Sequence, residues 1–174
     1  AEFDTVRSLL HKALELERGN VALTELAIAA EGVVRAAHIL SRRFTLVATN
    51  VPYLGRPDQG HQLKNYCDRY HAIAKSDLAT CLLDRCRGFA AIGGTISIVI
   101  TQSWLSQPRY KSFRKEVLRS GQFELIAKLG PRAFETISGE QVNVCLLVYS
   151  NTPPKPAHHF AGVGVTTFKG PSDK

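Results

Sequence analysis

The sequence predicts an α/β fold, because short apolar runs alternate with segments of helical periodicity. Four apolar runs have the length of strands, and they span residues 44–49, 94–101, 122–129 and 142–149. Helical segments at 69–89 and 109–118 separate the first three runs, and crossovers of this kind favour parallel strands. The link 130–141 is short, so we expect the fourth strand to run antiparallel to the third.

Helices are expected before the first strand. One apolar pattern of helical spacing covers residues 3–16 and breaks at Gly19 and Asn20. A second pattern covers residues 24–40 and is rich in alanine. Residues 1–40 therefore form a predicted helical lead-in to the sheet.

The end of the first strand is the most informative part of the chain. A buried strand from Phe44 to Ala48 is followed closely by Asn50-Val51-Pro52-Tyr53. Polar, rigid and aromatic groups thus stand at the carboxyl end of a strand, where open α/β sheets bind their ligands. Residues 51–65 are rich in proline and glycine, and we expect a long mobile loop there.

The tetrapeptide from Asn50 to Tyr53 resembles the Asn-Pro-Pro-Tyr motif of amino-group methyltransferases that use S-adenosylmethionine, above all the adenine-N6 DNA methyltransferases. In that chemistry the Asn50 side chain and the backbone carbonyl of Val51 accept hydrogen bonds from the target amine. Pro52 stiffens the loop and biases Val51 toward extended geometry. Tyr53 offers a ring for stacking on a base swung out of the duplex. Val51 replaces the first proline of the family pattern but retains a backbone carbonyl.

The resemblance extends from about residue 40 to about residue 150. Asp77-Leu78 looks like the pair that opens a helix after the catalytic loop in large adenine methyltransferases. The order of elements is similar to the second half of a Rossmann-like class I methyltransferase sheet, with parallel strands ending in an antiparallel hairpin. The nearest look-alikes are the large enzymes of restriction-modification and phage defence.

The resemblance also implies that half of the fold is missing. In the family a Gly-rich loop on an earlier strand holds S-adenosylmethionine, yet no Gly-x-Gly pattern precedes Asn50. We therefore expect residues 1–150 to be a partial catalytic domain, with 41–150 as its substrate-side half and 151–174 as a linker or tail. The main cofactor loop and a target-recognition domain are expected outside this chain. Phe160 to Phe168 is predicted to form one weak strand.

Further site residues follow from position and from the resemblance. Trp104 follows the second strand, and it is a candidate for the base pocket or for the core. Phe134 lies between the last two strands, where the family often supplies an aromatic side chain to the flipped base. Arg56 and Lys64 flank the catalytic loop on a chain of net charge +7, and they are candidates for phosphate contacts with DNA.

Composition excludes several classes of function. No apolar run is long enough to span a bilayer, and the start of the chain is unlike a secretory signal, so we expect a cytoplasmic location and no membrane partner. The four cysteines lack metal-ligand spacing and are expected to be reduced and buried. No metal site is predicted.

Two classes of function remain open. The first is methyl transfer to the N6 amino group of adenine in DNA by an enzyme of which this chain is a fragment, inactive alone. The second is a non-catalytic remnant or assembly subunit that binds DNA or protein. Within the first class, a glutamine-N5 protein methyltransferase is an alternative, because a side-chain amide needs the same two acceptors, and RNA adenine is a further possible substrate.

Overall fold

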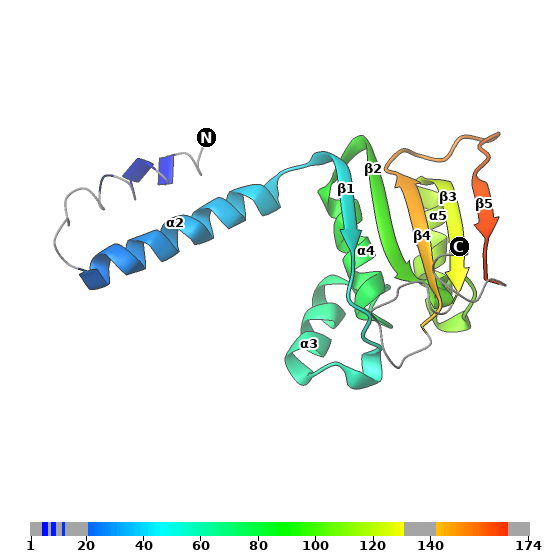
Figure 1. Ribbon diagram of the computed structural model, residues 1–174, viewed down its shortest axis with the longest axis horizontal. Coiled ribbons are helices and arrows are strands. Elements are labelled where there is room, and N and C mark those ends of the chain that lie inside the picture. The colour runs from blue at the N-terminus through cyan, green and yellow to red at the C-terminus, as the bar shows by residue number, and fades with distance from the viewer. Residues whose placement is uncertain (1–4, 7, 10–11, 13–20, 131–141, 167–174) are drawn as a thin grey trace. The chain divides into compact units, whose positions relative to one another are not determined.

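The computed structural model describes residues 5–6, 8–9, 12, 21–130 and 142–166. The chain divides into two compact units, residues 1–42 and residues 43–174, which are described separately. The first unit contains α2 (Val21–Ser41), whose bounds agree with the helix predicted over residues 24–40 (Figure 1). Most of the pattern predicted over residues 3–16 lies outside the described residues.

The second unit is built on a five-stranded sheet with the order β1-β2-β4-β3-β5 (Figure 1). The strands are β1 (Phe44–Asn50), β2 (Ala90–Thr101), β3 (Gln122–Gly130), β4 (Val144–Ser150) and β5 (Ala161–Gly164). β1 pairs parallel with β2, and β4 pairs antiparallel with both β2 and β3. The predicted strand directions are therefore confirmed. The insertion of β4 between β2 and β3 was not predicted, because link length determines direction but not which gap a strand enters.

Two helices cover one face of this sheet, α4 (Leu78–Phe89) and α5 (Lys111–Ser120). The helical segment predicted over residues 69–89 is shorter in the structure, because α4 begins only at Leu78, where Asp77 caps it by accepting a hydrogen bond from the Ala79 amide at 2.8 Å. α5 buries Phe113 and Val117, four residues apart on one side of the helix. The periodicity of both helices thus presents an apolar face to the sheet.

The segment after the first strand is more ordered than the sequence predicted. Residues 51–65 were expected to be one long loop, but a 3-10 turn at Arg56–Asp58 is followed by α3 (His61–Tyr70). The prediction was wrong because the prolines and glycines of this segment all precede residue 61, and the residues after Gly60 suit a helix. β5, within the predicted weak strand, pairs parallel with β3.

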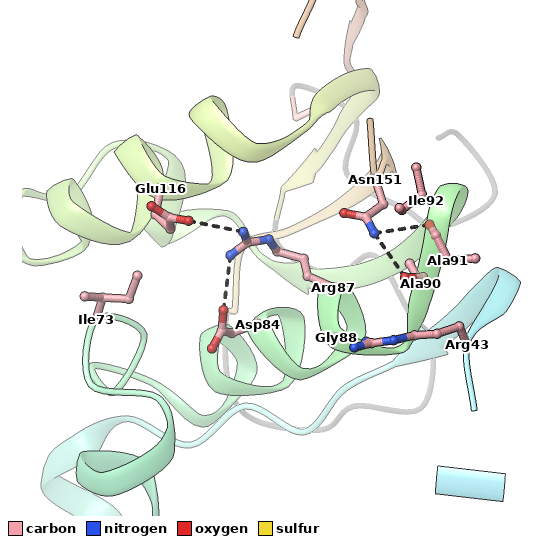
Figure 2. A pocket seen from close by; sticks show the side chains of 10 residues that line it. All are labelled: Arg43, Ile73, Asp84, Arg87, Gly88, Ala90, Ala91, Ile92, Glu116 and Asn151. Atoms are coloured by element: carbon pink, nitrogen blue, oxygen red, sulfur yellow. Dashed lines mark hydrogen bonds and ion pairs between the residues drawn. The ribbon is translucent and has the colours of Figure 1, made fainter. Parts of the chain in front are cut away.

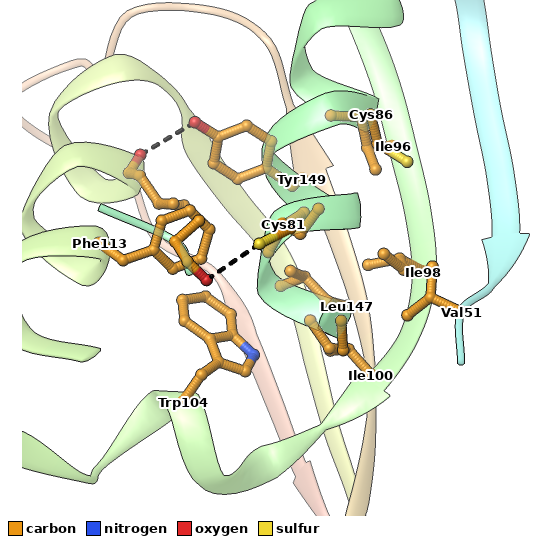
Figure 3. Close-up of a cluster of buried hydrophobic side chains, with 14 of the residues drawn as sticks. Val51, Cys81, Cys86, Ile96, Ile98, Ile100, Trp104, Phe113, Leu147 and Tyr149 are labelled. Atoms are coloured by element: carbon orange, nitrogen blue, oxygen red, sulfur yellow. Dashed lines mark hydrogen bonds between the residues drawn. The ribbon is translucent and has the colours of Figure 1, made fainter. Parts of the chain in front are cut away.

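The core lies between the sheet and α4 and α5 (Figure 3). Alternate residues of β2, Ile96, Ile98 and Ile100, are at most 1% exposed and face the helices. Aromatic rings fill the part of the core that lies against α5. The ring centroids of Trp104 and Phe113 are 5.7 Å apart. Full burial of each large apolar side chain contributes about 1.5–3 kcal/mol.

Within the described ranges, no helix is long and apolar enough to cross a membrane.

Candidate active site

The candidate site lies at the carboxyl edge of β1 and β2. Asn50 is the last residue of β1, and it is in register with Val99 of β2. Its side chain is exposed, and its Oδ1 accepts a long hydrogen bond, 3.4 Å, from the hydroxyl of Tyr53. The strand end thus presents an amide carbonyl, oriented by an aromatic residue three positions later.

The hydroxyl of Tyr53 remains protonated near neutral pH. Burial is the main reason that the pKa of Tyr53 is raised, and the nearby thiol of Cys145 adds to the effect. The half-buried ring packs against the core cluster. Tyr53 therefore acts as a donor toward Asn50 while its ring is fixed from beneath.

Val51 anchors the motif to the core. Its side chain is only 6% exposed, and Figure 3 shows it beside Ile98. Pro52, the next residue, is exposed. Because one side chain of the motif is buried and its neighbour faces outward, the backbone between them is held at the rim of the sheet. This gives Val51 a packing role that the sequence comparison with a proline did not predict.

A cluster of hydrogen bonds fixes the backbone directly after the motif. The carbonyl of Leu54 accepts from the amide of Leu78 at 2.9 Å and from the side-chain amide of Gln59 at 3.1 Å. The amide of Leu54 donates to Oδ1 of Asp77 at 3.4 Å. We call Leu54, Gln59, Asp77 and Leu78 the loop clamp. Asp77 and Gln59 are both nearly buried, so the clamp is shielded from competing water.

The clamp continues along the chain, because the amide of Arg56 donates to the carbonyl of Ser76 at 3.1 Å, and Gly55 and Asp77 form an isolated β-bridge. The loop that carries Asn50 is thereby tied to the start of α4. The sequence indicated that Asp77 opens a helix, but nothing in it indicated that Asp77 and Gln59 hold the loop.

The two candidate phosphate-binding residues are engaged within the chain. Nη2 of Arg56 lies 2.6 Å from Oδ2 of Asp68, and the other oxygen of Asp68 lies 2.9 Å from Nζ of Lys75. The hydrogen bond from Lys75, and then that from Arg56, lowers the pKa of Asp68. Lys64 donates to the carbonyl of Pro57 at 3.1 Å. All these groups are near the surface, where such bonds exchange readily with water.

Of the two aromatic candidates, Trp104 lies within the described part of the chain. Trp104 has no exposed surface and packs on Phe113 and Phe123, so of its two alternatives the structure supports the core. Its carbonyl accepts a hydrogen bond from Arg114 at 2.7 Å, which fixes the turn after β2. Phe134 lies outside the described residues.

A cavity of about 780 Å³ opens at the opposite edge of the sheet (Figure 2). It lies near Ala90, the first residue of β2, and Asn151, just after β4. Its most buried charge, Arg87, is paired with Asp84 at 3.1 Å and with Glu116 at 3.5 Å. Both contacts lie within the fold, so they offset the charge of Arg87 there. Among the described residues, no group of three or more His, Cys, Asp or Glu side chains is arranged to hold a metal ion.

Two curated proteins, both named adenine-specific methyltransferases, match most of this chain. BrxX of Escherichia coli O9:H4 (strain HS) is 30% identical over 133 residues, which are 76% of this chain and 11% of that protein. PglX of Lacticaseibacillus casei (strain Zhang) is 29% identical over 116 residues, which are 67% of this chain and 10% of that protein. The chain therefore spans about a tenth of the length of the curated relatives it matches. No protein-family model matches it.

Solved structures share the fold at low identity. A protein of Listeria monocytogenes assigned to the class I S-adenosylmethionine-dependent methyltransferases superposes with a TM-score of 0.55 at 15% identity, covering 75% of this chain and 39% of that one. The Type ISP restriction-modification enzyme LlaGI, solved with a DNA substrate mimic, gives 0.58 at 14%, covering 80% and 16%. DrdV in its DNA complex gives 0.57 at 18%, covering 83% and 17%. The predicted methyltransferase-like sheet is confirmed.

Proposed function

From homology to adenine-specific methyltransferases over three quarters of the chain, we propose that this chain is the substrate-side half of an enzyme that methylates the N6 amino group of adenine in DNA. The observation that carries the proposal is the position of Asn50. Its exposed side-chain carbonyl stands at the carboxyl end of β1, oriented by Tyr53 and backed by the loop clamp.

The chemistry requires acceptors at this place. The lone pair of an exocyclic amine on a purine is delocalised into the ring, so the nitrogen is a poor nucleophile. Oδ1 of Asn50 and the backbone carbonyl of Val51 each accept a hydrogen bond from one of the two N–H groups of the amine. The nitrogen becomes more tetrahedral as its lone pair localises. Because the acceptors are fixed before the amine arrives, little reorganisation is needed in the transition state.

S-adenosylmethionine, when bound, supplies the electrophilic methyl group. The residues of this chain fit only the substrate side of that reaction, because its sequence carries no Gly-x-Gly loop before Asn50. We propose that the cofactor loop lies on another part of the enzyme, beyond the β1 end of the sheet, and that a target-recognition domain lies elsewhere in it. The chain alone is then inactive.

Tyr53 has two compatible roles in this proposal. Its hydroxyl orients Asn50, and its ring face stacks on the extruded adenine. Arg56 and Lys64, beside the same loop, exchange their intrachain partners for DNA phosphates. The enzyme acts in the cytoplasm, and restriction-modification or phage defence is its proposed setting.

The proposal is tested on the complete enzyme that contains this segment. Single-turnover transfer of a labelled methyl group to an adenine-containing duplex is measured for wild type, Asn50→Ala and the control Asn65→Ala. Asn65 is an exposed asparagine of α3 outside the site. We expect Asn50→Ala to be about 100-fold slower or worse, as for loss of a preorganised polar group, and Asn65→Ala to be unaffected. Activity of Asn50→Ala within threefold of wild type contradicts the proposal.

Substrate class is decided in the same assay. A single-stranded RNA carrying adenine and a glutamine-containing peptide replace the duplex in parallel reactions. Methylation of the duplex alone supports the DNA assignment. Faster methylation of the peptide would instead favour the glutamine-N5 alternative, since the two acceptors serve an amide equally well.

A further inference from the structure

We propose that a second pocket at the carboxyl edge, beside Asn50, binds a phosphodiester of the DNA strand that carries the target adenine. The inference rests on the proposed function and deepens it, because it adds a phosphate subsite next to the base. The pocket has a volume of about 420 Å³. Its polar lining residues include Thr101, Gln102, Ser103, Gln107, Lys128 and Asn143.

The lining comes from three places that the sheet brings together. Thr101 ends β2, Gln102 and Ser103 begin the turn after it, and Lys128 lies near the end of β3. Asn143 precedes β4, and its carbonyl accepts the amide of Gln102 at 2.8 Å. This bond holds two walls of the pocket together, so the pocket is formed before any ligand arrives.

The charge of the lining favours an anion. Lys128 contributes an ammonium group for which the described residues offer no hydrogen-bond or ion-pair partner. Among the described residues, no aspartate or glutamate lines the pocket. The cavity at the opposite edge differs, because Asp84 and Glu116 already neutralise Arg87 there. The described lining of the proposed phosphate site therefore contains no acidic side chain that would neutralise Lys128.

Uncharged donors complete the site. The hydroxyl of Ser103 donates to that of Thr101 at 3.3 Å, which leaves the Thr101 hydroxyl proton free to bind a ligand oxygen. Oε1 of Gln102 is buried and has no hydrogen-bond partner among the described residues. Gln107 and Asn143 also line the pocket, and their side-chain amides can donate hydrogen bonds. Hydroxyl, amide and ammonium donors are the set that phosphate oxygens accept.

The spacing from Asn50 fits a nucleotide. Asn50 is in register with Val99, and Thr101 is two residues further along β2 on the same face. Neighbouring strands lie ~4.8 Å apart and rise ~3.3 Å per residue, so the Cα atoms of Asn50 and Thr101 are roughly 8 Å apart. A single nucleotide bridges such a distance between its base and its phosphate.

The first experiment is an NMR titration of the ¹⁵N-labelled chain with three probes: the dinucleotide monophosphate of deoxyadenosine, adenosine without phosphate, and inorganic phosphate. We expect the dinucleotide alone to shift the amides of Gln102, Ser103 and Asn143 saturably. Absence of saturable shifts overturns the inference. Equal shifts by adenosine would make the pocket a base site, and equal affinity for inorganic phosphate would make it a general anion site, and either result overturns it.

Variants then test the assigned charge. Lys128→Ala should weaken dinucleotide binding about three- to fivefold, as for one partly exposed ion pair. Lys115→Ala, which removes an exposed lysine of α5, is the matched control and should change nothing. Equal affinities for wild type and Lys128→Ala contradict the inference.

The complete enzyme separates this inference from the proposed function. A neutral methylphosphonate replaces each linkage around the target adenine in turn. One position should lower the affinity of wild type but not that of Lys128→Ala, and equal losses in both would overturn the subsite. If instead Asn50→Ala methylates normally while the phosphate effects persist, the proposed function fails and the phosphate subsite stands.

Discussion

Replacement of Asp77 by alanine tests whether one side chain both starts α4 and holds the loop that carries Asn50. Oδ1 of Asp77 accepts from the Ala79 amide at 2.8 Å and from the Leu54 amide at 3.4 Å. Loss of an N-cap costs about 1 kcal/mol. The Leu54 bond is long and half-buried, so its loss adds about 1 kcal/mol at most. We therefore expect Asp77→Ala to lower the free energy of unfolding by about 2 kcal/mol.

Thermal unfolding followed by circular dichroism measures this change. A loss of about 2 kcal/mol corresponds to a fall in Tm of roughly 4–8 °C for a chain of this size. Asp77→Asn is the matched control, because asparagine retains the acceptor and is equally favoured at the N-cap. Its Tm should stay within about 2 °C of wild type.

Hydrogen exchange separates the cap from the clamp. In Asp77→Ala the amides of Leu54 and Arg56 should exchange faster, whereas those in the middle of β2 should not. A Tm unchanged by Asp77→Ala would refute the reasoning as a whole. If Asp77→Ala is destabilised but the amides of Leu54 and Arg56 do not exchange faster, loss of the N-cap alone explains the result. The loop clamp would then not hold these residues.

Three further predictions follow from packing and charge. Leu83→Ala, in the core face of α4, should cost about 2–5 kcal/mol, and a urea titration that shows less than 1 kcal/mol would mean that the core is misplaced. Burial raises the pKa of Cys145 to about 12, so its neutral thiol stabilises the fold fully below pH ~8.5 and progressively less as the pH rises toward 12. Between pH 7 and pH 10 wild type should therefore lose about 2 kcal/mol more than Cys145→Ala, and identical losses would contradict this. Arg56→Ala and Lys64→Ala in the complete enzyme should each lower the slope of log affinity for DNA against log salt by about 1, as measured by fluorescence anisotropy, and unchanged slopes would return both residues to ordinary surface charges.

Local pattern predicted much of the fold and the centre of the site. The apolar runs that became β2, β3 and β4 are visible in the sequence, because a strand buried on one or both faces must be largely apolar. The run that became β1 was predicted to be a buried strand, but this was wrong, since its residues are exposed or only partly buried. The position of Asn50 at the end of the first run follows from the same pattern. Chain direction could also be predicted, since short links force antiparallel neighbours and helical crossovers favour parallel ones.

Contacts between distant residues decided the rest. Leu54 and Asp77 are far apart in the sequence, and their hydrogen bond exists only because α4 packs beside β1. The burial of Trp104 depends on Phe113 and Phe123, which come from two other elements. The insertion of β4 between β2 and β3 pairs β4 with two strands that precede it at different places in the sequence. The periodicity of a sequence indicates which face of a helix or strand is buried. It does not indicate which other helix or strand packs against that face, and this is decided by the packing of the whole fold.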